Sequence, residues 1–454
     1  MISGYCEEKY SPVKKIFEDY FLKQEEIGAS FAIYKEGKPL IDLYGGFKNK
    51  NNEKWEENTI VNVFSATKGI YEIIVSILIN ENILDLEKPV SYYWDAFKQS
   101  NKREIKLKHI LSHQSGLYRF KKKVTQQDLL DWNKIISILE NQEPDHLCGE
   151  KTYYHAKTHG FLIGEIIKKT TNKSLGTLVY ELLSKKFKLN FFIGTPKNQL
   201  SNIAFLYENK TESKISSEFN AFNNPEHEIN FYNKENWQTA EIPSMNGHGN
   251  ARSIAKIYDI FVNDLILEKN ILLSKSSIKK CLTESTNRID QSLMLPIRWS
   301  QVGLILRGGW LFGKNKESFG HNGWGGSLGF ADPILGIGIA YTTNKINPTM
   351  TSDQRVINLL KGFIVDYKAD MLRDIKITLE EDAIISDTDV IDQIADIIKT
   401  IKTNTNFCEK AIEKVQNSDT VAEILSSMEN TPYEEMEETV LNELFGLESI
   451  TRED

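Results

Sequence analysis

The stretch Phe64-Ser65-Ala66-Thr67-Lys68-Gly69-Ile70 is the most informative part of the chain, because it places a hydroxyl and an amine three residues apart where a helix is expected to begin. Residues three apart on a helix share one face, so the ammonium group of Lys68 can lie against the oxygen of Ser65. A serine with a lysine at this spacing is a candidate nucleophile that carries its own base.

The residues that follow predict one amphipathic helix. Apolar side chains recur at every third and fourth position, namely Ile70, Ile73, Ile74, Ile77 and Leu78. Ser65 then lies near the N-terminus, where free N–H groups and the helix dipole stabilise negative charge, while burial favours a neutral Lys68. An N-cap serine followed by a solvated lysine has the same spacing, so the spacing alone leaves both interpretations open.

Length and composition indicate a globular protein with a large core. The chain has 454 residues, of which 40% are hydrophobic and 26% charged, which is ordinary for a soluble protein. Residues 1–21 lack the continuous apolar stretch of a signal peptide, and the apolar residues among them that have helical spacing are Val13, Ile16, Phe17, Tyr20 and Phe21. No run reaches the ~20 apolar residues that a membrane span needs. We therefore expect a cytoplasmic protein that does not insert into a membrane.

The charge is divided between two parts of the chain. The net charge is −8, but the residues from Ala369 onward include 22 acidic and 7 basic ones, which leaves 41 acidic and 48 basic residues before them. The weak positive excess of the body is too diffuse to indicate nucleic-acid binding. We expect the acidic part either to dock on the body or to bind a protein partner.

The distribution of strand and helix patterns predicts an α/β (α+β) fold. Strands are expected at 29–34, 40–46, 302–306, 318–330 and 336–342, with a covering helix at 352–366. The pattern between residues 85 and 307 predicts helices and polar loops. Within it, residues 207–236 are expected to form a long surface connection. Strands at both ends with helices between them predict an antiparallel sheet flanked by helices and closed across a helical insertion. Residues 1–368 form this domain, and 369–454, with apolar side chains at helical spacing, form an acidic helical C-terminal domain.

Three further segments carry residues suited to catalysis. Tyr154 lies on a loop before an apolar helix, where a phenol can shuttle a proton or simply pack at an interface. His321 lies at a glycine-rich strand edge, where backbone N–H groups can face a substrate. Residues 243–253 read as a tight loop before a helix that either braces the site or only shapes the chain.

With these segments in place, the chain resembles the serine β-lactamase-like and penicillin-binding-protein-like hydrolases, in the class C and esterase branch. Five segments carry the resemblance in the family's order: Ser65 to Lys68, Leu111 to Leu117, Tyr154 to Ala156, Asn246 to Gly249, and Phe319 to Ser327. Together they are far more specific than any one motif, and they cover roughly residues 27–367.

The resemblance implies a role for each matched residue. Ser65 would be the acylated nucleophile, Lys68 and Tyr154 its proton-transfer partners, and His321 would stand where β-lactamases carry the lysine of their third motif. Asn322, Gly323 and Trp324 would contact the substrate, with the N–H groups of Ser65 and Trp324 forming an oxyanion hole.

Two departures from the β-lactamase pattern bear on the substrate. Ala156 stands where those enzymes commonly carry asparagine, and His321 replaces their lysine. Since both of their residues help to hold a β-lactam, the resemblance implies a small or peptidyl ester, a thioester or another acyl substrate, and an esterase-like serine hydrolase or transferase. A stand-alone thioesterase or cyclase and a D-amino-acid peptidase are the alternatives within the enzyme class.

Two interpretations from other classes stay open. His155 and His159, with His113 elsewhere, invite a metal site, but the sequence lacks the His-Glu-x-x-His pattern. Cys6, Cys148, Cys281 and Cys408 are scattered without zinc-ligand spacing. We therefore expect no metal and no cofactor.

The other interpretation is a catalytically silent scaffold on a hydrolase fold, which uses its acidic tail to bind a partner.

Overall fold

The computed structural model describes residues 2–208, 220–263, 273–306 except 294, 312–347 except 314 and 316, and 353–363. The chain divides into two units, Met1–Leu360 and Lys361–Asp454. The expected C-terminal domain at 369–454 lies outside the described residues, so its helices and its boundary stay predictions.

The centre of the first unit is an antiparallel sheet, as the sequence predicts. Within the described ranges it has nine strands in the order β1-β3-β2-β13-β12-β11-β10-β9-β8. In chain order these are β1 (Ile2–Cys6), β2 (Gly28–Lys35), β3 (Lys38–Gly46), β8 (Glu284–Asp290), β9 (Leu295–Ser300), β10 (Ile305–Leu306), β11 (Phe319–Asn322), β12 (Leu328–Asp332) and β13 (Ile337–Thr343). Because β2 pairs with β13, the two ends of this unit meet in the middle of the sheet.

Smaller sheets and many helices complete the unit. The strands β4 (Val61–Asn62), β7 (Gly247–Gly249) and β5 (Phe191–Ile193) form one small sheet, and β14 (Lys345–Ile346) pairs with β6 (Tyr207–Glu208). The helices are α1 (Ser11–Leu22), α2 (Ala66–Asn80), α3 (Val90–Tyr93), α4 (Leu107–Leu111), α5 (Trp132–Asn141), α6 (Thr158–Thr171), α7 (Leu175–Val179), α8 (Lys185–Phe187), α9 (Asn220–Asn223), α10 (Ile229–Tyr232), α11 (Glu235–Thr239), α12 (Ala251–Val262) and α13 (Lys275–Cys281). Short 3-10 or π turns are η1 (Glu8–Tyr10), η2 (Asp95–Lys98), η3 (Asp128–Leu130), η4 (Tyr180–Ser184) and η5 (Lys197–Asn202).

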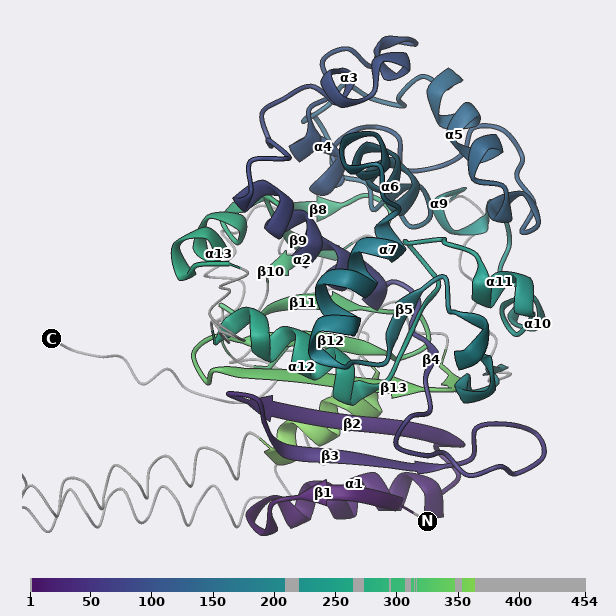
Figure 1. Ribbon diagram of the computed structural model, residues 1–454, viewed down its shortest axis with the longest axis vertical. Coiled ribbons are helices and arrows are strands. Elements are labelled where there is room, and N and C mark those ends of the chain that lie inside the picture. The colour runs from purple at the N-terminus through teal and green to yellow at the C-terminus, as the bar shows by residue number, and fades with distance from the viewer. Residues whose placement is uncertain are drawn as a thin grey trace, which may run out of the picture. The chain divides into compact units, whose positions relative to one another are not determined.

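Helix α12 lies across the middle of the main sheet, as Figure 1 shows. Two glycines let it approach closely. A Cβ atom at Gly338 would lie 2.1 Å from the carbonyl oxygen of Ala255, and one at Gly329 would lie 2.5 Å from the side chain of Ile254. The helix therefore packs directly on β12 and β13, which are buried along their whole length.

Helix α2 is the buried centre of the region between the sheet and the helical insertion. Every residue from Ala66 to Leu78 is buried, so this helix is apolar on all sides except at the few polar positions that form the site. Helices α3 to α6 gather beyond one end of the sheet (Figure 1), which agrees with the expected helical insertion.

The structure corrects three expectations about local structure. The segment expected to be a strand at 302–306 is a turn followed by the short strand β10. The segment at 243–253 is not only a loop, because Gly247–Gly249 form the central strand of the small sheet. The connection at 207–236 contains α9 and α10, and Tyr232 in it is buried, because aromatic residues there pack against the core.

Candidate active site

The start of α2 places Ser65 in the site. Ser65 is the residue that precedes the helix, with helical dihedral angles, and its side chain makes no capping hydrogen bond. Ser65 therefore occupies the N-cap position without capping the helix through its side chain, and its hydroxyl is left for another partner. The preceding Phe64 has a positive φ of 47°, a conformation that costs a residue with a side chain ~1–2 kcal/mol. A hydrogen bond of 2.5 Å from Thr67 Oγ1 to the Phe64 carbonyl oxygen holds this turn.

Lys68 is completely buried and its Nζ has three neighbours. It lies 3.1 Å from Ser65 Oγ and 3.0 Å from each of the carbonyl oxygens of Ala156 and Ser244. Carbonyl oxygens only accept hydrogen bonds, so a neutral amine directs its two hydrogens to them. Its lone pair is then the group that faces the Ser65 hydroxyl. This geometry lets Lys68 receive the proton of Ser65.

Burial also sets the charge of this amine. Desolvation lowers the pKa of Lys68 to about 7, against an opposing effect of Glu72 one turn further along α2. Neither carboxyl oxygen of Glu72 has a hydrogen-bond partner among the described residues, and burial raises its pKa well above the usual range. A neutral Glu72 beside a Lys68 amine that is partly neutral reduces the cost of an isolated buried charge.

Tyr154 lies beside this pair. Lys68 Nζ is 4.9 Å from the centre of its ring, and its hydroxyl has no hydrogen-bond partner among the described residues. Burial raises the pKa of the phenol, and Ser65 is the neighbour that opposes this rise. Tyr154 also stacks on Trp299, with ring centres 5.9 Å apart and planes 6° from parallel. The phenol is thus held in place by packing while its oxygen is left unpaired.

Asp290, at the end of β8, fixes the backbone beneath this phenol. Its Oδ1 accepts hydrogen bonds of 3.0 Å from the backbone N–H groups of Tyr154, Ser292 and Leu293. Burial raises the pKa of Asp290 to about 7, and these N–H donors oppose the rise. Asp290 is not predictable from the sequence, because a single aspartate 136 residues away from Tyr154 carries no local signal.

His321, on β11, completes the group. Its Nδ1 lies 2.7 Å from the carbonyl oxygen of Asn322, so Nδ1 carries the hydrogen and Nε2 is the acceptor. Nε2 has no partner among the described residues. Its ring centre is 5.9 Å from that of Tyr154, and burial lowers the pKa of His321 to about 3. The structure therefore brings Ser65, Lys68, Tyr154 and His321 together, with the histidine neutral.

The segment after His321 packs on the residues before Ser65. The Gly323 N–H donates to the carbonyl oxygen of Ser327 over 2.6 Å, so it is used within the turn. A Cβ atom at Gly323 would lie 2.1 Å from the carbonyl oxygen of Val63, which explains the glycine. The half-buried ring of Trp324 meets that of Phe64 edge to face at 5.1 Å.

Ser65 directly follows Phe64, so the backbone N–H groups of Ser65 and Trp324 both belong to residues at this junction. They are the two groups that the family resemblance assigns to an oxyanion hole, and this assignment stays a prediction. Backbone donors beside a nucleophile are able to stabilise the negative charge that develops during acyl transfer.

The three histidines of the metal hypothesis do lie together, but as a packed cluster. The ring centre of His113 is 5.1 Å from that of His155 and 4.5 Å from that of His159. His155 contacts Ser115 and the carbonyl oxygen of Tyr153, and His159 contacts Tyr71 and Leu111. Among the described residues, no group of three or more His, Cys, Asp or Glu side chains is arranged to hold a metal ion.

This fold and this site define a serine hydrolase of the β-lactamase type. The β-lactamase family model matches residues 13–361, and the chain belongs to that family. It is an enzyme of the hydrolase class with esterase-like relatives.

Three relatives illustrate the similarity. The esterase/β-lactamase LipL of Mycobacterium tuberculosis is 26% identical over 372 residues, which cover 78% of this chain and 85% of LipL. The crystal structure of a family VIII carboxylesterase matches with a TM-score of 0.75 and 32% identity over 80% of this chain and 98% of that one. A penicillin-binding protein homologue from Caulobacter crescentus has the same TM-score at 28% identity, over 81% of this chain and 100% of its own. None of the helices in the described residues is both long and apolar enough to cross a bilayer.

Proposed function

We propose that this chain is an esterase that forms an acyl-enzyme at Ser65 with a small or peptidyl ester. The observation that carries the proposal is the buried Lys68 amine, which has Ser65 Oγ and two carbonyl oxygens as its only hydrogen-bonding neighbours in the described residues. With its hydrogens directed to the carbonyls, the amine is a base aimed at the serine hydroxyl.

The reaction runs in two halves. Ser65 Oγ attacks the ester carbonyl carbon while its proton passes to Lys68, and the N–H groups of Ser65 and Trp324 stabilise the oxyanion. Tyr154 relays a proton to the departing alcohol oxygen as the C–O bond breaks, which leaves the acyl group on Ser65. Water then attacks the acyl carbon and its proton passes to Lys68. The bond between that carbon and Ser65 Oγ breaks, the proton returns from Lys68 to Ser65 Oγ, and the carboxylic acid is released.

The charges around the site favour a neutral substrate. His321 is uncharged near neutral pH, because burial holds its pKa far below that range. The nearby Lys157 donates to the carbonyl oxygen of Phe222 over 2.5 Å and also to that of Pro225. Neither residue therefore supplies a free positive charge for a substrate carboxylate. The binding of a β-lactam requires such a charge. The names of LipL and of the family VIII carboxylesterase agree with ester hydrolysis.

The thioesterase or cyclase and the D-amino-acid peptidase differ from this proposal only in leaving group and acceptor. No observation in the described residues favours either of them over ester hydrolysis. A protein partner for the acidic C-terminal region and a cytoplasmic location also stay predictions.

The test combines labelling with a substrate panel. Purified protein is incubated with a fluorophosphonate, and the labelled peptide is identified by mass spectrometry. We expect one adduct on Ser65 and turnover of p-nitrophenyl acetate and butyrate well above that of nitrocefin or a D-alanine p-nitroanilide. S65A is the control, with its fold checked by circular dichroism. An adduct elsewhere, or equal esterase activity in S65A, would overturn the proposal.

A further inference from the structure

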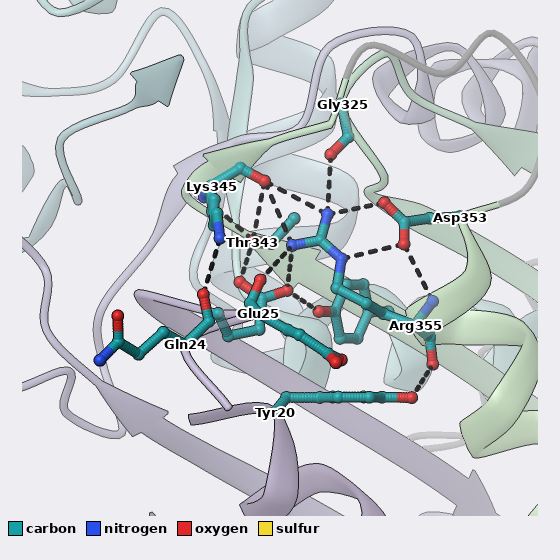
Figure 2. A network of polar contacts seen from close by, with 10 residues as sticks. Tyr20, Gln24, Glu25, Gly325, Thr343, Lys345, Asp353 and Arg355 are labelled. Atoms are coloured by element: carbon teal, nitrogen blue, oxygen red, sulfur yellow. Dashed lines mark hydrogen bonds and ion pairs between the residues drawn. The ribbon is translucent and has the colours of Figure 1, made fainter. Parts of the chain in front are cut away.

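A buried arginine joins four segments of the chain behind the turn that follows His321. Arg355 is 6% exposed and belongs to the helical residues 354–363. Its Nε and Nη2 bind the two carboxylate oxygens of Asp353 over 2.9 and 2.6 Å, and its Nη1 binds Glu26 Oε1 over 2.5 Å. Both Nη atoms also reach the carbonyl oxygen of Lys345, at 3.3 and 3.2 Å. Figure 2 shows the guanidinium at the centre of these contacts.

The network is rigid because its other members are held as well. Thr343 Oγ1 donates to Glu26 Oε2 over 2.8 Å, and the Tyr341 hydroxyl donates to the other oxygen of Glu26. The Tyr20 hydroxyl donates to the backbone carbonyl oxygen of Arg355 over 2.8 Å. The arginine is therefore fixed to α1, to the end of β13 and to the loop before β2.

One arm of the guanidinium reaches the turn that carries Trp324. Arg355 Nη2 donates to the carbonyl oxygen of Gly325, a contact that Figure 2 draws as a dashed line. The two atoms are 3.4 Å apart, and the same oxygen accepts from the Asn347 N–H over 3.2 Å. At Gly326, where φ is 112°, a Cβ atom would lie 2.6 Å from Asp353 Oδ2 and 3.0 Å from Arg355 Nη2. The Asp353–Arg355 pair is thus packed directly against the backbone of Gly325 and Gly326.

We propose that Arg355 is a positioning residue, which fixes the Gly325–Gly326 turn and thereby aims the Trp324 N–H at the oxyanion. The inference rests on the proposed function, because only acyl transfer at Ser65 gives that N–H a charge to stabilise. Arg355 does not touch the reacting atoms. Arg355 acts through the backbone, because it binds the carbonyl oxygen of Gly325, the residue that directly follows Trp324. A displacement of a fraction of an ångström at an oxyanion donor lowers the reaction rate strongly.

Arginine suits this position better than lysine would. Its planar fork binds Asp353 with two parallel hydrogen bonds and still has donors for Glu26, Lys345 and Gly325. A lysine has one nitrogen and cannot serve partners on several sides at once. R355K therefore keeps the charge that the two carboxylates need but gives up the contact with the turn.

The experiment compares R355K with Y20F. Y20F removes one hydrogen bond from the same network and leaves the guanidinium intact, so it is the matched control for a general loosening. Active sites are counted first by the stoichiometry of fluorophosphonate labelling, and kcat for p-nitrophenyl butyrate is expressed per labelled site. We expect kcat per site to fall about 10-fold or more in R355K, with KM within about twofold of wild type. In Y20F both constants should stay within about twofold.

A loss of stability alone would lower the number of labelled sites but not the rate at each site. A per-site kcat in R355K within twofold of wild type overturns the inference while leaving the proposed esterase intact. If R355K does not fold, D353N decides, because it loosens one side of the guanidinium, and an unchanged per-site kcat in D353N also overturns the inference. If wild-type protein is not labelled at Ser65, the proposed function fails and this inference falls with it.

Discussion

The carbonyl oxygen of Ser244 lies 3.0 Å from Lys68 Nζ, 176 residues apart in the chain. The hydroxyl of the same serine accepts a 2.6 Å hydrogen bond from the backbone N–H of Gly160, at the start of α6. Ser244 therefore ties the base on α2 to the helix that follows Tyr154.

Activity should depend on the deprotonation of Lys68. Burial lowers its pKa from 10.5 to about 7, and only the neutral amine can take the proton of Ser65. We expect kcat/KM to rise with pH through an apparent pKa near 7 and to fall about tenfold per unit well below it. The pH profile of p-nitrophenyl butyrate hydrolysis measures this. K68R, whose side chain stays charged, should lose about 10²–10⁴-fold in activity. A flat profile between pH 5 and 9 would contradict the assignment.

Removing the phenol oxygen should separate activity from stability. The Tyr154 hydroxyl is buried and has no hydrogen-bond partner in the described residues, so Y154F loses no such bond and sheds a desolvation cost. We expect the melting temperature of Y154F to equal or exceed that of wild type, while kcat/KM falls about 10²-fold. Thermal denaturation and steady-state kinetics on the same preparation decide the matter. Full activity in Y154F would remove the phenol from the mechanism.

Lys157 should give folding stability a dependence on pH. Burial lowers the pKa of Lys157 to about 7 in the folded protein, well below that of an unfolded lysine. Between about pH 7 and pH 10 the unfolded chain binds one more proton at this residue, so the free energy of unfolding rises with pH there. Its slope should reach about 1.4 kcal/mol per pH unit more in wild type than in K157M. Urea unfolding at several pH values measures the difference, and parallel curves for the two proteins would refute it.

The close contact between α12 and the sheet should make Gly338 intolerant of any side chain. A Cβ atom there would lie 2.1 Å from the backbone oxygen of Ala255, so we expect G338A to lose about 3 kcal/mol of unfolding free energy. The control is G149A. Gly149 has a φ of 82° but open space around it, with His109 Nε2 at 4.0 Å, so that change should cost only about 1 kcal/mol of strain. If urea denaturation shows that G338A and G149A lose the same free energy of unfolding, α12 can shift to accommodate the added methyl group and the prediction is wrong.

Local patterns revealed what lies within a few residues in the sequence. The start of α2 and the Ser65–Lys68 pair were predictable, because a helix brings residues three apart onto one face. The resemblance to a known family brought in Tyr154 and His321. Asp290 and the carbonyl oxygens that hold Lys68 were not predictable, because they come from distant segments and a backbone acceptor leaves no trace in residue identity.

The same limit applies to the fold. Strands β2, β3 and β13 were predictable from apolar runs. The single strand expected at 318–330 was wrong, because this glycine-rich segment contains two strands, β11 and β12, and the turn between them. The edge strand β1 was not, because most of its side chains are exposed and a short edge strand has no alternating pattern to read. Arg355 was missed for a similar reason, since a single arginine in a helical pattern is ordinarily solvated.

The pairing of β2 with β13 has a consequence for biosynthesis. The two strands are about 300 residues apart in the chain, and at ~5–20 residues per second a ribosome needs about 15–60 s to bridge that distance. Throughout this interval the edge of β2 that will pair with β13 is apolar and unpaired, and such an edge is a template for aggregation. Nascent chains stalled before residue 337 should therefore depend on chaperones, and they should gain resistance to proteases only once β13 has left the exit tunnel.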